Sequence, residues 1–151
     1  MKALVQRVSR ARVAVHDRVV GEIARGLLVF VAATHTDDEA AADWLAAKAA
    51  GLRIFPDAAG KMARDVRDAQ GAMLIVPQFT LYGDTRRGRR PEFIRAAPPE
   101  QAERLFDRFC RTVEASGIPV ARGAFRESMR VELVNEGPVT LLLESPAPGE
   151  T

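Results

Sequence analysis

The sequence predicts an α+β fold, with barrel-like or sandwiched β-sheets covered by two main helices. Apolar runs of strand length fill most of the chain, two segments have helical spacing, and strands and helices do not alternate strictly. With 151 residues, of which 47% are apolar, the chain is long enough to bury one continuous core. We therefore expect a single domain over residues 1–145 and a solvated tail over residues 146–151.

The first third of the chain is predicted to be extended. Strands are expected at residues 2–8, 11–16 and 19–23, which are rich in apolar and β-branched residues. Gly26 precedes the uninterrupted apolar run 27–33. Such a run is typical of a strand that is covered on both faces.

Two segments have helical spacing. Thr36 and Glu39 form a capping-box pair, so the first helix is expected at residues 37–52. The second helix is expected to begin at Pro98 and to stop at Gly117, because proline favours a first turn and glycine an end. Its inward stripe is Ala102, Leu105, Phe106, Phe109 and Val113. We expect these aromatic side chains to belong to the core.

Two polar motifs interrupt the later strands. Strands are expected at residues 72–76, 120–124, 129–134 and 139–143, and the motifs are Pro77-Gln78-Phe79-Thr80-Leu81 and Asn135-Glu136-Gly137-Pro138-Val139-Thr140. A proline inside a strand pattern removes a hydrogen-bond donor, and a glycine lets a ligand approach the backbone. Gly137-Pro138 is therefore the stronger candidate site. An ordinary turn between two strands is the alternative.

Composition excludes several classes of protein. Cys110 is the only cysteine and lies on the apolar face of the second helix, so a disulfide within the chain and a cysteine metal centre are excluded. His16 and His35 are too few for a three-ligand zinc site. We expect no metal and no cofactor. No stretch approaches the roughly 18 apolar residues that cross a bilayer, so we expect a cytoplasmic protein without a membrane partner.

The motifs resemble those of the D-aminoacyl-tRNA deacylases, from Met1 to about Ser145. The similarity is carried by Val5-Gln6-Arg7-Val8-Ser9, Gly60-Lys61-Met62, Gln78-Phe79-Thr80-Leu81-Tyr82-Gly83-Asp84, Arg89-Arg90-Pro91 and Val134-Asn135-Glu136-Gly137-Pro138-Val139-Thr140. The resemblance implies a homodimer that hydrolyses the ester bond of D-aminoacyl-tRNA, and of mischarged glycyl-tRNA, as chiral proofreading in translation. The first motif of the family usually begins with serine, which Pro77 replaces here. Proline is similar to a more permissive branch, so some L-aminoacyl-tRNAs are alternative substrates.

The predicted catalytic residues are Gln78, Phe79 and Thr80. No strong side-chain nucleophile is evident, but an aminoacyl ester is activated and carries a neighbouring ribose hydroxyl that can assist attack. Positioning contributes about 7 to 11 kcal/mol, and one donor to the oxyanion about 3 to 4 kcal/mol. The backbone N–H groups of Phe79 and Thr80 are candidate donors, and the ring of Phe79 can stack on the terminal adenine. Thr80 as a nucleophile is the alternative, although no base stands beside it in the sequence.

The resemblance assigns Gly137 and Pro138 of one subunit to the pocket of the other. Their carbonyl groups would hold the amino group of the substrate and leave no space for a side chain of the L configuration. Arg7 is expected to brace this dipeptide, Asn135 to bond its backbone, and Met129 to line the pocket.

A cationic loop close to Thr80 contains Arg86, Arg87, Arg89 and Arg90. Arginine matches phosphate oxygens without reading sequence, so we expect this loop to bind the tRNA backbone, and we expect no DNA partner. Two other functions remain open. One is a non-catalytic tRNA-binding module that uses this loop and Phe79. The other is a small-molecule-binding dimer that does not need the arginines.

Overall fold

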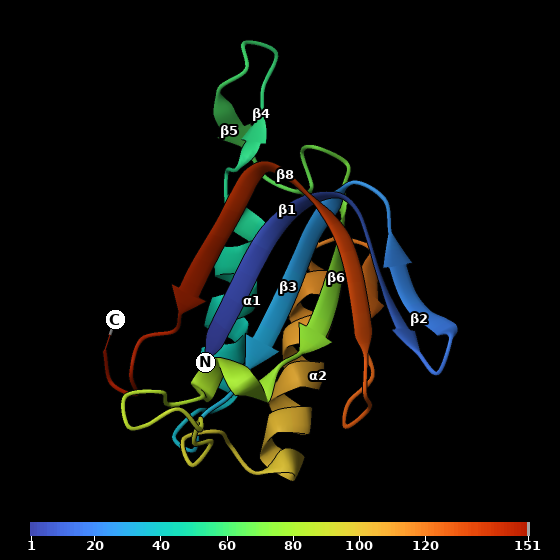
Figure 1. Ribbon diagram of the computed structural model, residues 1–151. Helices are drawn as coiled ribbons and strands as arrows, with labels where there is room; N and C mark the ends of the chain where they lie inside the picture. The colour runs from blue at the N-terminus through green and yellow to red at the C-terminus, as the bar shows by residue number, and fades with distance from the viewer. Residues whose placement is uncertain (151) are drawn as a thin grey trace.

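Two helices pack on one face of a curled six-stranded sheet in the computed structural model, which describes residues 1–150 (Figure 1). The strand order is β2-β1-β3-β6-β7, and β8 pairs with β1. These strands are β1 (Lys2–Val15), β2 (Arg18–Ile23), β3 (Gly26–Ala32), β6 (Ala72–Pro77), β7 (Val120–Arg122) and β8 (Arg130–Glu144). The helices are α1 (Glu39–Gly51) and α2 (Pro99–Ala115), and a small hairpin of β4 (Phe55–Pro56) and β5 (Met62–Arg64) projects from one end. The predicted α+β class is confirmed.

The curl of the sheet follows from the pairing of β1. Its first half pairs with β3 and its second half with β2, while β8 runs antiparallel to it along nearly its whole length. At the far edge β2 approaches β7 so closely that a Cβ atom on Gly21 would lie 2.7 Å from the carbonyl oxygen of Arg122. Only a residue without a side chain fits there. The sheet is therefore nearly closed and barrel-like.

Apolar clusters lie on both faces of the central strands. Leu27 and Val29 of β3 face the cluster under the helices, whereas Leu28 packs inside the curl. β6 alternates in the same way, with Met73 toward the helices and Leu74 inside the curl. All five side chains are fully buried. The prediction that the apolar run of β3 is covered on both faces is confirmed.

The start of α1 differs from the predicted capping box. Asp38, rather than Thr36, is the N-cap, and its side chain accepts a hydrogen bond from the first turn at 3.0 Å. Asp37 is not a solvated residue of the helix end. It is buried, and its carboxylate accepts from the α-ammonium of Met1 at 2.9 Å and from the amide of Thr34 at 2.7 Å. This buried ion pair joins β1 to the loop before α1.

The two helices are tied together by Asp43 of α1. Its carboxylate accepts from Nε and Nη2 of Arg108 at 2.7 and 2.8 Å, and from the hydroxyl of Thr112 at 2.8 Å. The Arg108 hydrogen bond, chiefly, holds the pKa of Asp43 below its ordinary value. The core position predicted for Cys110 of α2 is confirmed. Neither helix is long and apolar enough to cross a membrane.

β1 and β8 are each continuous where two strands were predicted. The irregular residues are accommodated by register shifts between them, at Gln6/Val8 and Val8/Arg10. The second motif therefore lies inside a strand, and the alternative of a turn between two strands is wrong.

The chain continues past β8 along the edge of β1. The amide of Ser145 donates to the carbonyl oxygen of Met1 at 2.9 Å. Residues 147–150 are then exposed. The predicted tail, 146–151, also includes Thr151, which lies outside the described residues.

Candidate active site

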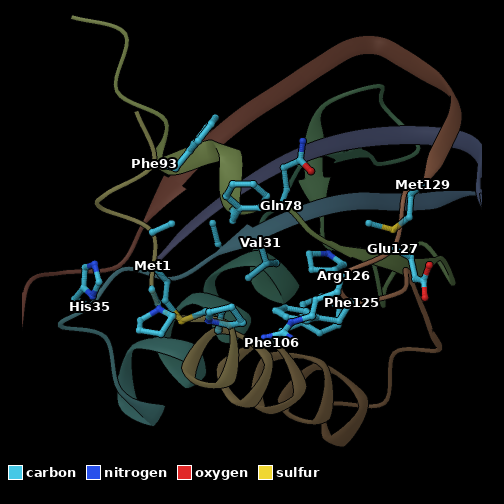
Figure 2. Close-up of a pocket in the computed structure, with 18 of the residues that line it drawn as sticks. Met1, Val31, His35, Gln78, Phe93, Phe106, Phe125, Arg126, Glu127 and Met129 are labelled. Carbon is cyan, nitrogen blue, oxygen red and sulfur yellow. The ribbon is translucent and has the colours of Figure 1, made fainter. Parts of the chain in front are cut away.

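A pocket of about 660 Å³ opens where β3 and β6 end, between the sheet and α2 (Figure 2). Its wall combines the first motif, the segment leading into α2, the first turns of α2 and the loop between β7 and β8. The lining residues are Met1, Val31, Ala32, His35, Pro77, Gln78, Phe79, Phe93, residues 96–99, Ala102, Phe106 and residues 125–129. Most of this lining is apolar, with a few polar groups, as in many sites for small organic groups.

The first motif leaves the sheet at this pocket. Pro77 ends β6, the amide of Gln78 donates to the carbonyl oxygen of Val31 at 2.9 Å, and Phe79 begins the short 3₁₀ helix η1 (Phe79–Tyr82). Because Phe79 and Thr80 are its first residues, their amide N–H groups have no backbone acceptor among residues 1–150. Gln78 and Phe79 line the pocket, whereas Thr80 is exposed beside it.

The titratable side chains that line the pocket are His35, Arg126 and Glu127. Nε2 of His35 lies 2.7 Å from the carbonyl oxygen of Ile94, so this nitrogen carries the proton and donates. Tyr82 at the end of η1 is buried, and burial, followed by the charge of Asp37, raises the pKa of its phenol. The phenol is therefore protonated at neutral pH.

The second motif presents bare backbone. The Gly137-Pro138 peptide bond is cis, and Gly137 has φ +114°, a value that residues with side chains rarely adopt. Both residues are exposed. A Cβ atom on Gly137 would lie 2.7 Å from Nη2 of Arg7 and 3.0 Å from the side chain of Val139. The dipeptide therefore offers carbonyl groups at a position where no further side chain fits.

Arg7 and Asn135 fix the backbone on both sides of this dipeptide. Nε of Arg7 donates to the carbonyl oxygen of Glu136 at 3.3 Å, and Nη1 donates to that of Ile54 at 2.6 Å. The amide nitrogen of Asn135 donates to the carbonyl oxygens of Arg7 and Val139, both at 3.0 Å. These contacts hold the dipeptide in one conformation.

The two motifs lie at opposite ends of the sheet within one molecule (Figure 1). Pro77 is level with Val31 of β3 and with Ala3 of β1, whereas the dipeptide lies beside Arg7. Four residues of strand separate these levels, about 13 Å. One chain therefore brings Gly137, Pro138, Asn135 and Arg7 together, but it does not bring them to the pocket.

Met129 lies just before β8 and lines the pocket (Figure 2). Its sulfur atom would be 3.0 Å from a Cβ atom on Gly123, so the side chain packs against bare backbone. Sequence reasoning missed its neighbours Phe125, Arg126 and Glu127, which also line the pocket. The only signal for them is a short polar break between two predicted strands.

The arginine loop lies at the same end as the first motif. Arg86 is paired with Asp84 at 2.7 Å, and its side-chain hydrogen bond lowers the pKa of Asp84 to about 2. Arg87, Arg89 and Arg90 are exposed, and none has a carboxylate within 4.0 Å in the described chain. Three of the four predicted RNA-binding side chains are therefore available to an anion.

Comparison with known proteins points to one family. The family model described as D-Tyr-tRNA(Tyr) deacylase matches residues 4–144. The D-aminoacyl-tRNA deacylase of Symbiobacterium thermophilum is 58% identical over 145 residues, which cover 96% of each chain. The D-aminoacyl-tRNA deacylase of Geobacter metallireducens is 54% identical over 146 residues, which cover 97% of each chain.

Two solved structures share the fold. One, titled c-Myc DNA Unwinding Element Binding Protein, has a TM-score of 0.92 and 38% identity, covering 97% of this chain and 100% of that one. The other, a probable eukaryotic D-amino acid tRNA deacylase, has a TM-score of 0.82 and 19% identity, covering 95% and 98%. At that identity the second likeness shows the fold alone.

Proposed function

This chain belongs to the D-Tyr-tRNA(Tyr) deacylase family and hydrolyses the ester bond of D-aminoacyl-tRNA, and we propose that it sorts enantiomers with a dipeptide from a second copy of itself. One observation carries this proposal. The dipeptide Gly137-Pro138 and the pocket at Phe79 are both exposed, but within one molecule they lie at opposite ends of the sheet. Two copies related by a two-fold axis would complete two equal sites, because each would lend its dipeptide to the other.

Exposed apolar side chains on β8 support such a homodimer. Val134, Leu141 and Leu142 are 40%, 38% and 57% exposed on the strand that carries the dipeptide. Exposed apolar side chains on one strand are typical of a surface that another protein covers. A second copy packed against the face of β8 that carries Leu142, the most exposed of the three, would bury that side chain and carry its own dipeptide toward the pocket.

Selection would work by exclusion. The carbonyl groups beside Gly137 and Pro138 would accept hydrogen bonds from the amino group of the bound aminoacyl ester. Arg7 and Asn135 hold this backbone rigidly, so it cannot yield to a side chain of the L configuration. Glycine carries no side chain, so mischarged glycyl-tRNA would be a substrate too.

Bond cleavage would depend on positioning. The free N–H groups of Phe79 and Thr80 would stabilise the oxyanion as water adds to the ester carbonyl, and the neighbouring ribose hydroxyl would assist. The C–O bond to the ribose then breaks and releases a free D-amino acid and tRNA. The ring of Phe79, which is 56% exposed, would stack on the terminal adenine. The arginine loop would hold the tRNA backbone. Aminoacyl-tRNA as the substrate suggests a cytoplasmic enzyme.

The direct test compares hydrolysis of D-tyrosyl-tRNA and L-tyrosyl-tRNA by the purified protein. We expect cleavage of the D ester only. Equal cleavage of both esters would contradict stereoselection by exclusion, and cleavage of neither would contradict the enzymatic assignment.

Pro77 raises the alternative of a more permissive enzyme. It lines the pocket at the end of β6 and has no amide donor of its own. Comparing D-alanyl-tRNA and L-alanyl-tRNA before and after Pro77→Ser distinguishes the two. Cleavage of the L ester that disappears in the serine variant would favour the permissive enzyme.

A further inference from the structure

An exposed apolar patch lies at the mouth of the pocket, beside the arginine loop. Phe79, Phe93 and Ile94 are 56%, 39% and 78% exposed. Single exposed apolar residues are common on protein surfaces, but a cluster of three beside a pocket is less common. Stacking on the terminal adenine would occupy Phe79 and leaves Phe93 and Ile94 without a role.

The ring of Phe93 is held in a fixed orientation. Its centroid lies 5.2 Å from that of Phe79, with the ring planes inclined by 72°. On another side, its Cε1 atom would be 3.0 Å from a Cβ atom on Gly83, so it packs directly against the backbone. Figure 2 shows this ring at the edge of the pocket. The part of the ring that remains exposed therefore requires little further ordering on binding.

The backbone around Ile94 is also fixed while its side chain stays in solvent. Nε2 of His35 donates to the carbonyl oxygen of Ile94 at 2.7 Å, and the hydroxyl of Thr34 donates to that of Arg95. The amide of Ala97 donates to the carbonyl oxygen of Ala33 at 2.9 Å. These contacts anchor the segment to the end of β3.

Cations lie directly beside this patch. The backbone groups of Asp84 and Glu92 exchange hydrogen bonds of 2.7 and 3.0 Å, which close the arginine loop at its base. Glu92 immediately precedes Phe93, so the loop that carries the exposed Arg87, Arg89 and Arg90 ends directly beside the patch. Apolar faces combined with cations that contact the backbone are the usual means of binding single-stranded nucleic acid.

We propose that Phe93 and Ile94 form a platform for the unpaired nucleotides that precede the terminal adenosine of tRNA, an inference that rests on the proposed function. Bases within the acceptor stem are stacked in a helix and do not expose their faces, whereas the unpaired 3′ end does. The platform binds the substrate at the mouth of the pocket, so its main contribution is affinity for the polynucleotide rather than selection of the amino acid.

The first test uses two substrates, D-tyrosyl-tRNA and the D-tyrosyl ester of adenosine, which lacks the preceding nucleotides. Phe93→Ala should raise KM for the tRNA by about fivefold to 100-fold and raise KM for the adenosine ester by a clearly smaller factor, because Phe93 also packs against Phe79 at the pocket. Ile94→Ser, at a side chain that is mostly in solvent, should raise KM for the tRNA by a smaller factor, and Phe93→Trp should restore it. Val19→Ser, at another exposed apolar position, is the matched control.

A second test does not depend on ester cleavage. Uncharged tRNA should bind the wild-type protein more tightly than the same tRNA without its last three nucleotides, and Phe93→Ala should reduce that difference to the part that stacking of the terminal adenine on Phe79 supplies. Wild-type protein that binds in this way but cleaves neither ester would contradict the proposed function while supporting the platform.

Three results would overturn the platform. Equal losses on the two ester substrates would show that Phe93 only supports Phe79. Unchanged kinetics and binding in both variants would show that the patch makes no contact with tRNA. A change of oligomeric state in Ile94→Ser, measured by light scattering, would assign the patch to a contact between copies.

Discussion

Arg7 and Gly137 face each other across the β1–β8 pair so closely that a Cβ atom on Gly137 would lie 2.7 Å from Nη2 of Arg7. The guanidinium cannot move away without cost, because it donates to the carbonyl oxygens of Ile54 and Glu136. Gly137 also has φ +114°. Two independent features therefore require glycine at this position: the lack of space for a Cβ atom and the positive φ angle.

Gly137→Ala should lower kcat/KM for D-tyrosyl-tRNA more than tenfold, since a loss of about 1.4 kcal/mol of transition-state stabilisation is enough. The strained backbone should also lower the free energy of unfolding by about 1 to 3 kcal/mol. Steady-state kinetics and urea denaturation measure the two effects. Gly51→Ala, where nothing lies within 4 Å of the added carbon at the end of α1, should be neutral or slightly stabilising. Unchanged turnover in the Gly137 variant would place the dipeptide outside the site.

Mixed dimers should show whether each site uses two copies. A chain with Gly137→Ala and a chain with Phe79→Ala, carrying different tags and purified as the mixed dimer, should have about half the wild-type activity, because one of the two sites is intact. Each variant alone should be nearly inactive. A reciprocal dimer, with both substitutions in one chain and a wild-type partner, should be inactive. The opposite pattern would mean that each site is built within one chain.

The arginine loop should set the salt dependence of tRNA binding. Replacing Arg87, Arg89 and Arg90 with alanine should weaken binding similarly for all tRNAs. For each phosphate group that the variant no longer binds, the slope of log affinity against log salt should fall by about one. Filter binding between low and physiological salt measures this slope. Arg18→Ala, an exposed arginine of β2 that has no carboxylate within 4.0 Å in residues 1–150, should leave the slope unchanged. A loop variant with the wild-type slope would exclude an interaction of these arginines with phosphate.

The link between Asp43 and Arg108 should be sensitive to acid. Arg108 lowers the pKa of Asp43 from its ordinary value of 3.8, so the folded state binds fewer protons than the unfolded state near that pH. The stabilisation is present above pH 3.8 and is lost as the pH falls through the lower, folded pKa. Asp43→Asn should therefore cost about 0.2 to 1 kcal/mol at pH 7, the range for partly exposed pairs, and nothing in strong acid. Urea denaturation at both pH values measures it, with Asp17→Asn as an exposed control. A cost that does not change with pH would contradict the ion pair.

The helices and the central strands were predictable because their signals are local. The stripe of Leu105 and Phe109 and the apolar run of β3 each determine which face is buried, whatever the rest of the chain does. The two motifs could also be identified from the sequence, because their polar residues interrupt apolar strand patterns. A sequence pattern also locates Arg86 to Arg90 correctly as an exposed polar loop.

Distances across the fold were not predictable. The separation of Gly137 from Phe79 depends on the register of β8 on β1, which pairs residues more than a hundred positions apart. Asp37 was interpreted as a helix-end residue because its partner, the ammonium of Met1, comes from another element. Arg126 and Glu127 carry no periodic signal, and only the tertiary placement of the loop between β7 and β8 brings them to the pocket.

Under the proposed function, the opposite placement of dipeptide and pocket makes activity depend on encounters between two copies. In the proposed homodimer, a freshly synthesised polypeptide holds all the required groups but has no complete active site until it pairs with a second copy. At levels below the dissociation constant of the pair, the rate should therefore grow with the square of the amount of polypeptide, so that proofreading capacity falls faster than abundance.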